Sequence, residues 1–168
     1  SVRPLFTAVY DIEIWSYTTL VAVVETPFEP AITDPESLAL EWVPAAGVTD
    51  LTLHPGFAAS WPMLRDAMAV RPVIVVDVAN VMGSTPNGWW KDRAGAAGKV
   101  LSSFADVASG GVAAAELELP GAVWFPRVVA VLEGEAKAAP DVSGVVVERA
   151  SGSGDDEIVA VVTREAER

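Results

Sequence analysis

Four acidic residues in the second half of the chain have the clearest potential for chemistry. Asp77 and Glu133 each close a run of apolar residues, and Asp155 and Asp156 follow a Ser-Gly-Ser-Gly turn. Carboxylates held close together repel one another or recruit a cation, and hard oxygen ligands select Mg²⁺ or Mn²⁺. A metal ion held there would polarise a phosphoryl oxygen and activate a water molecule, which is the chemistry of phosphoester hydrolysis.

These residues have distinct expected roles. We expect Asp77, Asp155 and Asp156 to be catalytic and, together with Glu133, to ligate the metal. Asn80 follows Asp77 by three residues, and we expect it to assist or to orient water, as Glu133 would. A structural alternative exists for each acid, because Asp favours turns and the first turn of a helix, where a cap stabilises by about 0.5–2 kcal/mol.

The elements that must position these acids are strands and helices in alternation. The apolar run within residues 72–81 and the runs at 127–132 and 144–148 indicate buried strands. Helices are expected near 91–108, ended by a Gly-Gly pair, and at 155–167. Strands that alternate with helices predict a mainly parallel sheet, whose carboxyl edge would carry all the acids.

Residues 70–168 resemble an NYN-type member of the PIN-like nuclease superfamily. The matching motifs are Asp77-Val78-Ala79-Asn80, Glu133 and Gly154-Asp155-Asp156-Glu157-Ile158. Val78 stands where that family usually has glycine, and Glu133 where it often has aspartate. The resemblance implies a PIN-like three-layer α/β domain with a metal-binding acidic pocket that hydrolyses RNA or nucleotides.

Residues 1–68 have a different pattern. Residues 10–25 alternate and are rich in β-branched and aromatic residues, which predicts a strand, and residues 38–43 predict a second, short one. Three prolines within 26–35 indicate a loop, and the apolar residues of 57–68 recur at helical spacing. Two strands and one helix form a poor independent core, so this segment is expected to be half of a larger unit.

That segment resembles the C-terminal half of a Nudix hydrolase domain. The matching residues are Trp15-Ser16-Tyr17-Thr18-Thr19, Glu36-Ser37, Glu41-Trp42-Val43-Pro44, and Leu53-His54-Pro55-Gly56-Phe57 with Trp61 and Leu64. The resemblance implies a partial α+β segment of an NTP pyrophosphohydrolase. The catalytic signature of that family, G-x5-E-x7-R-E-U-x-E-E-x-G-U with U bulky and apolar, is absent. Its nearest match, Arg164-Glu165-Ala166-Glu167, lacks the required upstream glutamate and glycine.

Composition narrows the remaining possibilities. The chain is acidic, with a formal net charge of −12, which argues against a broad basic surface for DNA but suits divalent cations. It has no cysteine and one histidine, so disulfides, thiolate metal sites and multi-histidine zinc sites are excluded. No apolar run reaches the roughly 18 residues of a membrane span and no signal peptide is evident, so we expect a cytoplasmic protein without membrane contact.

Two functional hypotheses follow from the sequence. The first is a metal-dependent phosphoester hydrolase with a nucleotide or single-stranded RNA as substrate. The second is a catalytically silent accessory or dimerisation region of a longer nucleotide pyrophosphohydrolase, in which the exposed edge of residues 10–43 pairs with another chain, for instance in a homodimer. Trp89 and Trp90 are open to two interpretations, either stacking of nucleic acid bases or burial in a core or interface.

Overall fold

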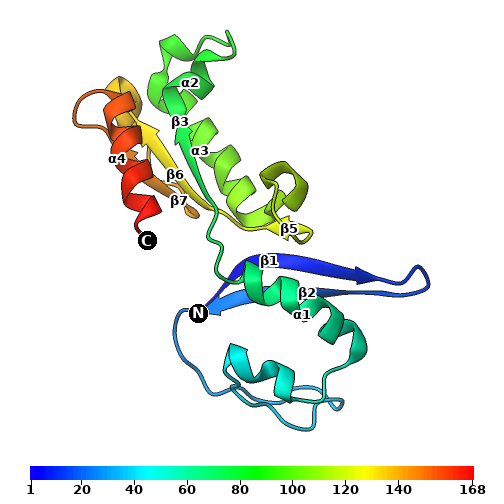
Figure 1. Cartoon of the computed structure of the whole chain (residues 1–168). Helices are drawn as coiled ribbons and strands as arrows, with labels where there is room; N and C mark the ends of the chain where they lie inside the picture. The colour runs from blue at the N-terminus through cyan, green and yellow to red at the C-terminus, as the bar shows by residue number, and fades with distance from the viewer.

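The computed structural model describes all 168 residues and contains two separate sheets (Figure 1). One sheet has four strands in the order β2-β1-β5-β4, and the other has three strands in the order β3-β6-β7. The fold is therefore mixed α/β, with one antiparallel and one parallel sheet. None of the helices combines the length and the apolar character needed to cross a membrane.

The four-stranded sheet is built on a long hairpin. Strands β1 (Val2–Asp11) and β2 (Ser16–Val24) pair antiparallel, and α1 (Pro55–Ala67) lies along one face of them (Figure 1). Trp61 and Leu64 of α1 join Leu5 and Phe6 of β1 in one buried cluster. The apolar spacing of the 57–68 segment therefore predicted this helix correctly.

Two expectations for the first half were wrong. Residues 10–25 are not one strand, because Tyr10 and Asp11 end β1 and a turn precedes β2. Residues 38–43 form no strand, although they alternate in the sequence. Strand structure needs a partner, and no strand pairs with this segment, so Leu38 is 94% exposed and Trp42 63%.

The three-stranded sheet has the parallel arrangement expected from the sequence. Strands β3 (Val73–Asp77), β6 (Arg127–Leu132) and β7 (Val145–Arg149) pair in parallel, with Asp77 opposite Val131. This confirms the α/β class of the unit and leaves its PIN-like identity a prediction.

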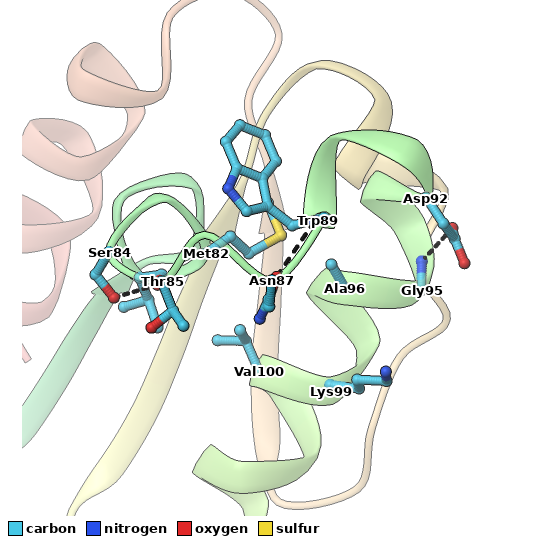
Figure 2. A pocket seen from close by; sticks show the side chains of 12 residues that line it. Met82, Ser84, Thr85, Asn87, Trp89, Asp92, Gly95, Ala96, Lys99 and Val100 are labelled. Atoms are coloured by element: carbon cyan, nitrogen blue, oxygen red, sulfur yellow. Dashed lines mark hydrogen bonds between the residues drawn. The ribbon is translucent and has the colours of Figure 1, made fainter.

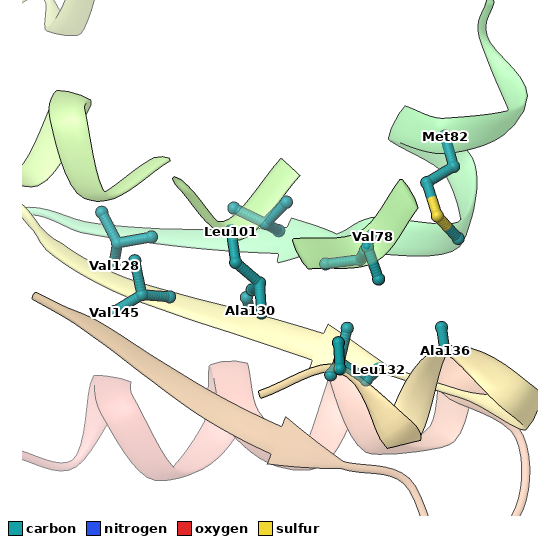
Figure 3. Packing of buried hydrophobic residues seen from close by; sticks show 11 residues of the cluster. Val78, Met82, Leu101, Val128, Ala130, Leu132, Ala136 and Val145 are labelled. Atoms are coloured by element: carbon teal, nitrogen blue, oxygen red, sulfur yellow. The ribbon is translucent and has the colours of Figure 1, made fainter. Parts of the chain in front are cut away.

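Helices cover both faces of this sheet. On one face, α2 (Val78–Gly83) and α3 (Arg93–Gly110) pack on the strands around Leu101, Ala130 and Leu132 (Figure 3). On the other face, α4 (Gly154–Ala166) buries Val161 against Val129 and Val131. Val162, the next residue of α4, is 50% exposed, so the buried face of this helix is narrow.

Two very short strands complete the first sheet, and no sequence signal predicted them. Strand β5 (Val123–Trp124) pairs with β1 and with β4 (Val112–Ala113). The Trp124 ring stacks on Phe6 with ring centroids 4.5 Å apart, and both side chains are fully buried. Contacts therefore cross the boundary expected between the domains 1–68 and 70–168, since part of the second segment completes the first sheet.

Candidate functional site

Asp77 lies at the junction of β3 and α2, where its carboxylate caps the helix. Its Oδ1 accepts a hydrogen bond from the backbone N–H of Asn80 at 3.0 Å. This bond ends β3 at residue 77, so the expected strand of residues 72–81 is shorter than the apolar pattern indicated. Asn80 takes part through its backbone, and its side chain is exposed.

Glu133 follows β6 directly and reaches a second helix start. Its Oε2 accepts a hydrogen bond of 2.8 Å from the backbone N–H of Gly154, the first residue of α4. Ser153, which precedes that helix, makes no capping bond with its own side chain. Glu133 therefore supplies, from another element, the acceptor that a helix start needs.

Asp155 and Asp156 lie in the first turn of α4 and are exposed. Together with Glu157 they place three acids where the helix dipole favours negative charge. This is the structural alternative that the sequence had left open for these two residues.

The predicted metal ligands Asp77, Glu133, Asp155 and Asp156 do not form a cluster in this arrangement. The structure contains no group of three or more histidine, aspartate or glutamate side chains that could hold a metal ion. The parallel pairing does bring Asp77 and Glu133 to one edge of the sheet, but each carboxylate is hydrogen-bonded to a helix start. Their catalytic and metal-binding roles stay predictions.

A hollow of about 450 Å³ lies between α2, the loop 84–88 and the start of α3 (Figure 2), and none of the predicted metal ligands lines it. Asp92 shapes its rim by capping α3, since its Oδ1 accepts the N–H of Gly95 at 2.8 Å. Trp89 belongs to its wall, whereas Trp90 is not a lining residue. The sequence feature at this site is Gly88-Trp89-Trp90. It did not indicate which of the two tryptophans would line the pocket.

An aromatic cluster marks the first sheet, formed by Tyr10, Trp15, Tyr17 and His54. The Trp15 and His54 rings stack with centroids 6.2 Å apart, and Tyr17 meets each of them edge-on. The Nδ1 atom of His54 accepts the N–H of Gly56 at 3.2 Å and so begins α1. The hydroxyl of Tyr17 is buried without a hydrogen-bond partner.

Gly56 explains why this cluster is closely packed. A Cβ atom at this position would lie 3.1 Å from the Tyr10 ring and 3.2 Å from the Tyr17 ring. Two of the four sequence blocks that carry the Nudix resemblance, those around Trp15 and around His54, therefore meet in space. Their separation in the sequence concealed this contact.

The chain is similar to a curated bacterial protein over part of its length. It is 46% identical over 63 residues to a protein named "Putative 8-oxo-dGTP diphosphatase 3" in Mycobacterium tuberculosis, with the same values for the strains CDC 1551 and H37Rv. The similarity covers 38% of this chain and 29% of that relative. No family model matches the chain, and no solved structure matches it.

An 8-oxo-dGTP diphosphatase performs a Nudix-type activity, so the similarity supports the Nudix part of the sequence resemblance. Nothing comparable supports the PIN-like part.

Proposed function

We propose that this chain acts in nucleotide hydrolysis of the Nudix type, as a part that binds nucleotide. The similarity to the 8-oxo-dGTP diphosphatase over 63 residues carries this proposal. The similarity covers less than a third of that relative. We therefore propose, for this chain, the substrate and the activity that the name of the relative states.

The aromatic cluster supports the proposal as a place for a purine ring. Trp15 is 45% exposed and is held from behind by Tyr17 and His54. An exposed indole that is fixed in orientation stacks a base at little entropic cost, and such stacking contributes about 1–3 kcal/mol per base.

The chain does not supply the glutamates of the Nudix catalytic signature. We therefore expect it to bind 8-oxo-dGTP without hydrolysing it, unless those glutamates come from outside the 168 residues. This agrees with the second hypothesis from the sequence, an accessory region of a longer pyrophosphohydrolase.

Isothermal titration of the chain with 8-oxo-dGTP, together with an assay of pyrophosphate release, tests this function. We expect binding without release, and a loss of affinity of roughly tenfold in Trp15→Ala, as the stacking energy implies. Trp42→Ala is the control, because Trp42 is exposed but lies outside the aromatic cluster and meets Phe28 edge-on. Absence of binding, or equal losses in both variants, would reject the proposal.

A homodimer is part of the same proposal. Strand β2 is an edge of its sheet, and its nine residues contain no charged residue and no proline. Such an edge presents free backbone groups to another strand without the charges that usually prevent pairing. Sedimentation of the wild type and of Leu20→Lys checks it, because a lysine on this edge should convert a dimer to a monomer. A monomeric wild type would exclude the dimer.

A second candidate function is the metal-dependent hydrolysis of phosphoesters, with Mg²⁺ or Mn²⁺ as cofactor. The observation in its favour is that the Glu133 carboxylate reaches the helix start that carries Asp155 and Asp156. Asp77 ends a strand at the same edge of the sheet. The nucleotide or single-stranded RNA expected from the sequence would be its substrate.

Calorimetric titration with Mn²⁺ tests this second function. We expect one bound ion in the wild type and none in the double variant Asp77→Asn with Asp155→Asn. Absence of binding in the wild type, or unchanged binding in the double variant, would reject it.

A further inference from the structure

The hollow between α2 and α3 has the size of a small-molecule site. Its volume of about 450 Å³ falls within the roughly 300–1,000 Å³ typical of ligand pockets. It lies beyond the carboxyl end of β3, since α2 follows that strand without a break. Open α/β sheets bind their ligands at this end of the strands.

The apolar part of the wall offers contacts for a flat ring. Met82 is buried, with 6% exposed, and Trp89 and Val100 are half-buried. The Arg93 guanidinium lies 5.5 Å from the centre of the Trp89 ring and holds it in place. A thioether and an indole both attract aromatic rings.

The polar part of the wall provides an amide and a cation. Asn87 accepts the N–H of Trp89 through its Oδ1 at 3.2 Å, which leaves its amide N–H groups free to donate (Figure 2). Figure 2 shows the Asn87 side chain between Trp89 and Val100. Lys99 is the one basic residue of the wall, and its ammonium group forms no ion pair.

Asp92 also lines the pocket but forms no ion pair with Lys99. Its carboxylate caps the start of α3 by accepting the N–H of Gly95, which lies on the same helix as Lys99. An ammonium group without a fixed carboxylate partner is free to attract the anionic group of a ligand.

We propose that this pocket binds a small planar aromatic anion, of which a nucleoside monophosphate is the representative. The ring would contact Met82 and Trp89, the Asn87 amide would donate to the edge of the ring, and the anionic group would lie at Lys99. This site belongs to the parallel sheet and is separate from the aromatic cluster, so it does not depend on the nucleotide binding proposed for that cluster.

Titration calorimetry with four probes tests the proposal: adenosine monophosphate, adenosine, inorganic phosphate and indole-3-acetate. We expect adenosine monophosphate to bind at least fivefold more tightly than adenosine or phosphate alone. Indole-3-acetate tests whether the anionic group is a phosphate or a carboxylate. Tighter binding of this probe than of adenosine monophosphate would identify an aromatic carboxylate as the ligand. Absence of binding by both aromatic anions overturns the proposal.

Matched variants locate the binding. Lys99→Gln should weaken adenosine monophosphate at least fivefold and leave adenosine unchanged, and Asn87→Ala should weaken both probes. Lys91→Gln is the control, since Lys91 is close in sequence but does not line the pocket. Equal losses in Lys91→Gln and Lys99→Gln would overturn the proposal. Both lysines are exposed, so neither variant threatens folding.

Trp15→Ala separates this site from the proposed nucleotide function. The variant should retain adenosine monophosphate binding at Lys99, whereas a loss there would assign that binding to the aromatic cluster and overturn the pocket.

Discussion

The carboxylate of Glu133 accepts a hydrogen bond from the backbone N–H of Gly154 at 2.8 Å, so the end of β6 holds the start of α4. Helix starts expose N–H groups without partners within the helix, and a side chain of the preceding residue usually accepts one of them. Here the acceptor comes from a residue 21 positions earlier in the sequence. A residue predicted from the sequence to ligate a metal and to assist catalysis therefore also has a structural role.

Removal of the Glu133 carboxylate should weaken folding. We expect Glu133→Ala to lower the free energy of unfolding by about 0.5–2 kcal/mol, the usual cost of a lost helix cap, and Glu133→Gln to cost less because its amide oxygen still accepts. Urea denaturation measures this. Glu135→Ala is the control, since its side chain is 81% exposed. If both alanine variants cost the same, Glu133 does not act as a cap.

A methyl group at Gly154 should also weaken the hydrogen bond between Gly154 and Glu133, and so lower the stability of the fold. A Cβ atom there would lie 2.7 Å from Oε2 of Glu133, so Gly154→Ala must displace the carboxylate. We expect lower stability, although alanine is a better helix former than glycine. The double variant Gly154→Ala with Glu133→Ala should lose less than the sum of the two single variants. Additive losses in a double-mutant cycle would contradict the contact.

Two measurements on Asp77 separate capping from metal binding. Asparagine caps a helix about as well as aspartate, so Asp77→Asn should leave stability within about 0.5 kcal/mol, whereas Asp77→Ala should cost about 1 kcal/mol. If the carboxylate also ligates Mn²⁺, Asp77→Asn should abolish ion binding while the protein stays as stable as the wild type. Thermal unfolding with and without Mn²⁺ gives both values. A stable Asp77→Asn with unchanged ion binding leaves the residue with the capping role alone.

Trp124 should be among the residues on which stability depends most. It is fully buried against Phe6, and its indole N–H donates to the carbonyl oxygen of Pro120 at 2.7 Å. We expect Trp124→Ala to cost about 3–5 kcal/mol, and Trp124→Phe clearly less because a ring remains. Trp90→Ala is the control, with 54% of the residue exposed. A small loss in circular dichroism melts of Trp124→Ala would contradict this dependence.

The pKa of the Asp34 carboxyl group should lie below the ordinary value for aspartate. The hydroxyl of Ser37 donates to its Oδ2 at 2.8 Å, and the N–H of Ser37 to its Oδ1 at 2.9 Å, and these bonds lower the pKa of Asp34 from its usual 3.8. Because the pKa is lower in the folded state, the turn gains stability above pH 3.8 and loses it as pH falls through the lowered value. In an NMR titration, Ser37→Ala should raise the pKa of Asp34, whereas Ser102→Ala should not.

The parallel sheet could be predicted from the sequence, because buried strands need continuous apolar runs and three such runs were present. The helix ends were also readable, since Gly110-Gly111 closes α3 as expected. The short strands β4 and β5 could not be predicted. Two residues carry no periodicity, and their strand structure comes from pairing with β1, which is distant in the sequence.

The candidate site was predicted in part. The edge shared by Asp77 and Glu133 followed from the parallel order of the strands. The directions in which the two carboxylates point could not be predicted. Each carboxylate accepts a hydrogen bond from the first N–H groups of a helix, and the sequence does not indicate which helix start it will reach. The pocket beside α3 was missed for a similar reason, since Trp89 and Trp90 have the same side chain and only their packing distinguishes them.

Only Phe125 and Pro126 lie between β5, which belongs to the first sheet, and β6, which belongs to the second. A gene fusion that joined an unrelated domain to this chain at residue 69 would remove β1 and leave β5 without its partner, with Trp124 uncovered. The two halves are therefore not interchangeable modules. Engineered recombination would have to replace the hairpin and residues 112–124 together, because they pair in one sheet.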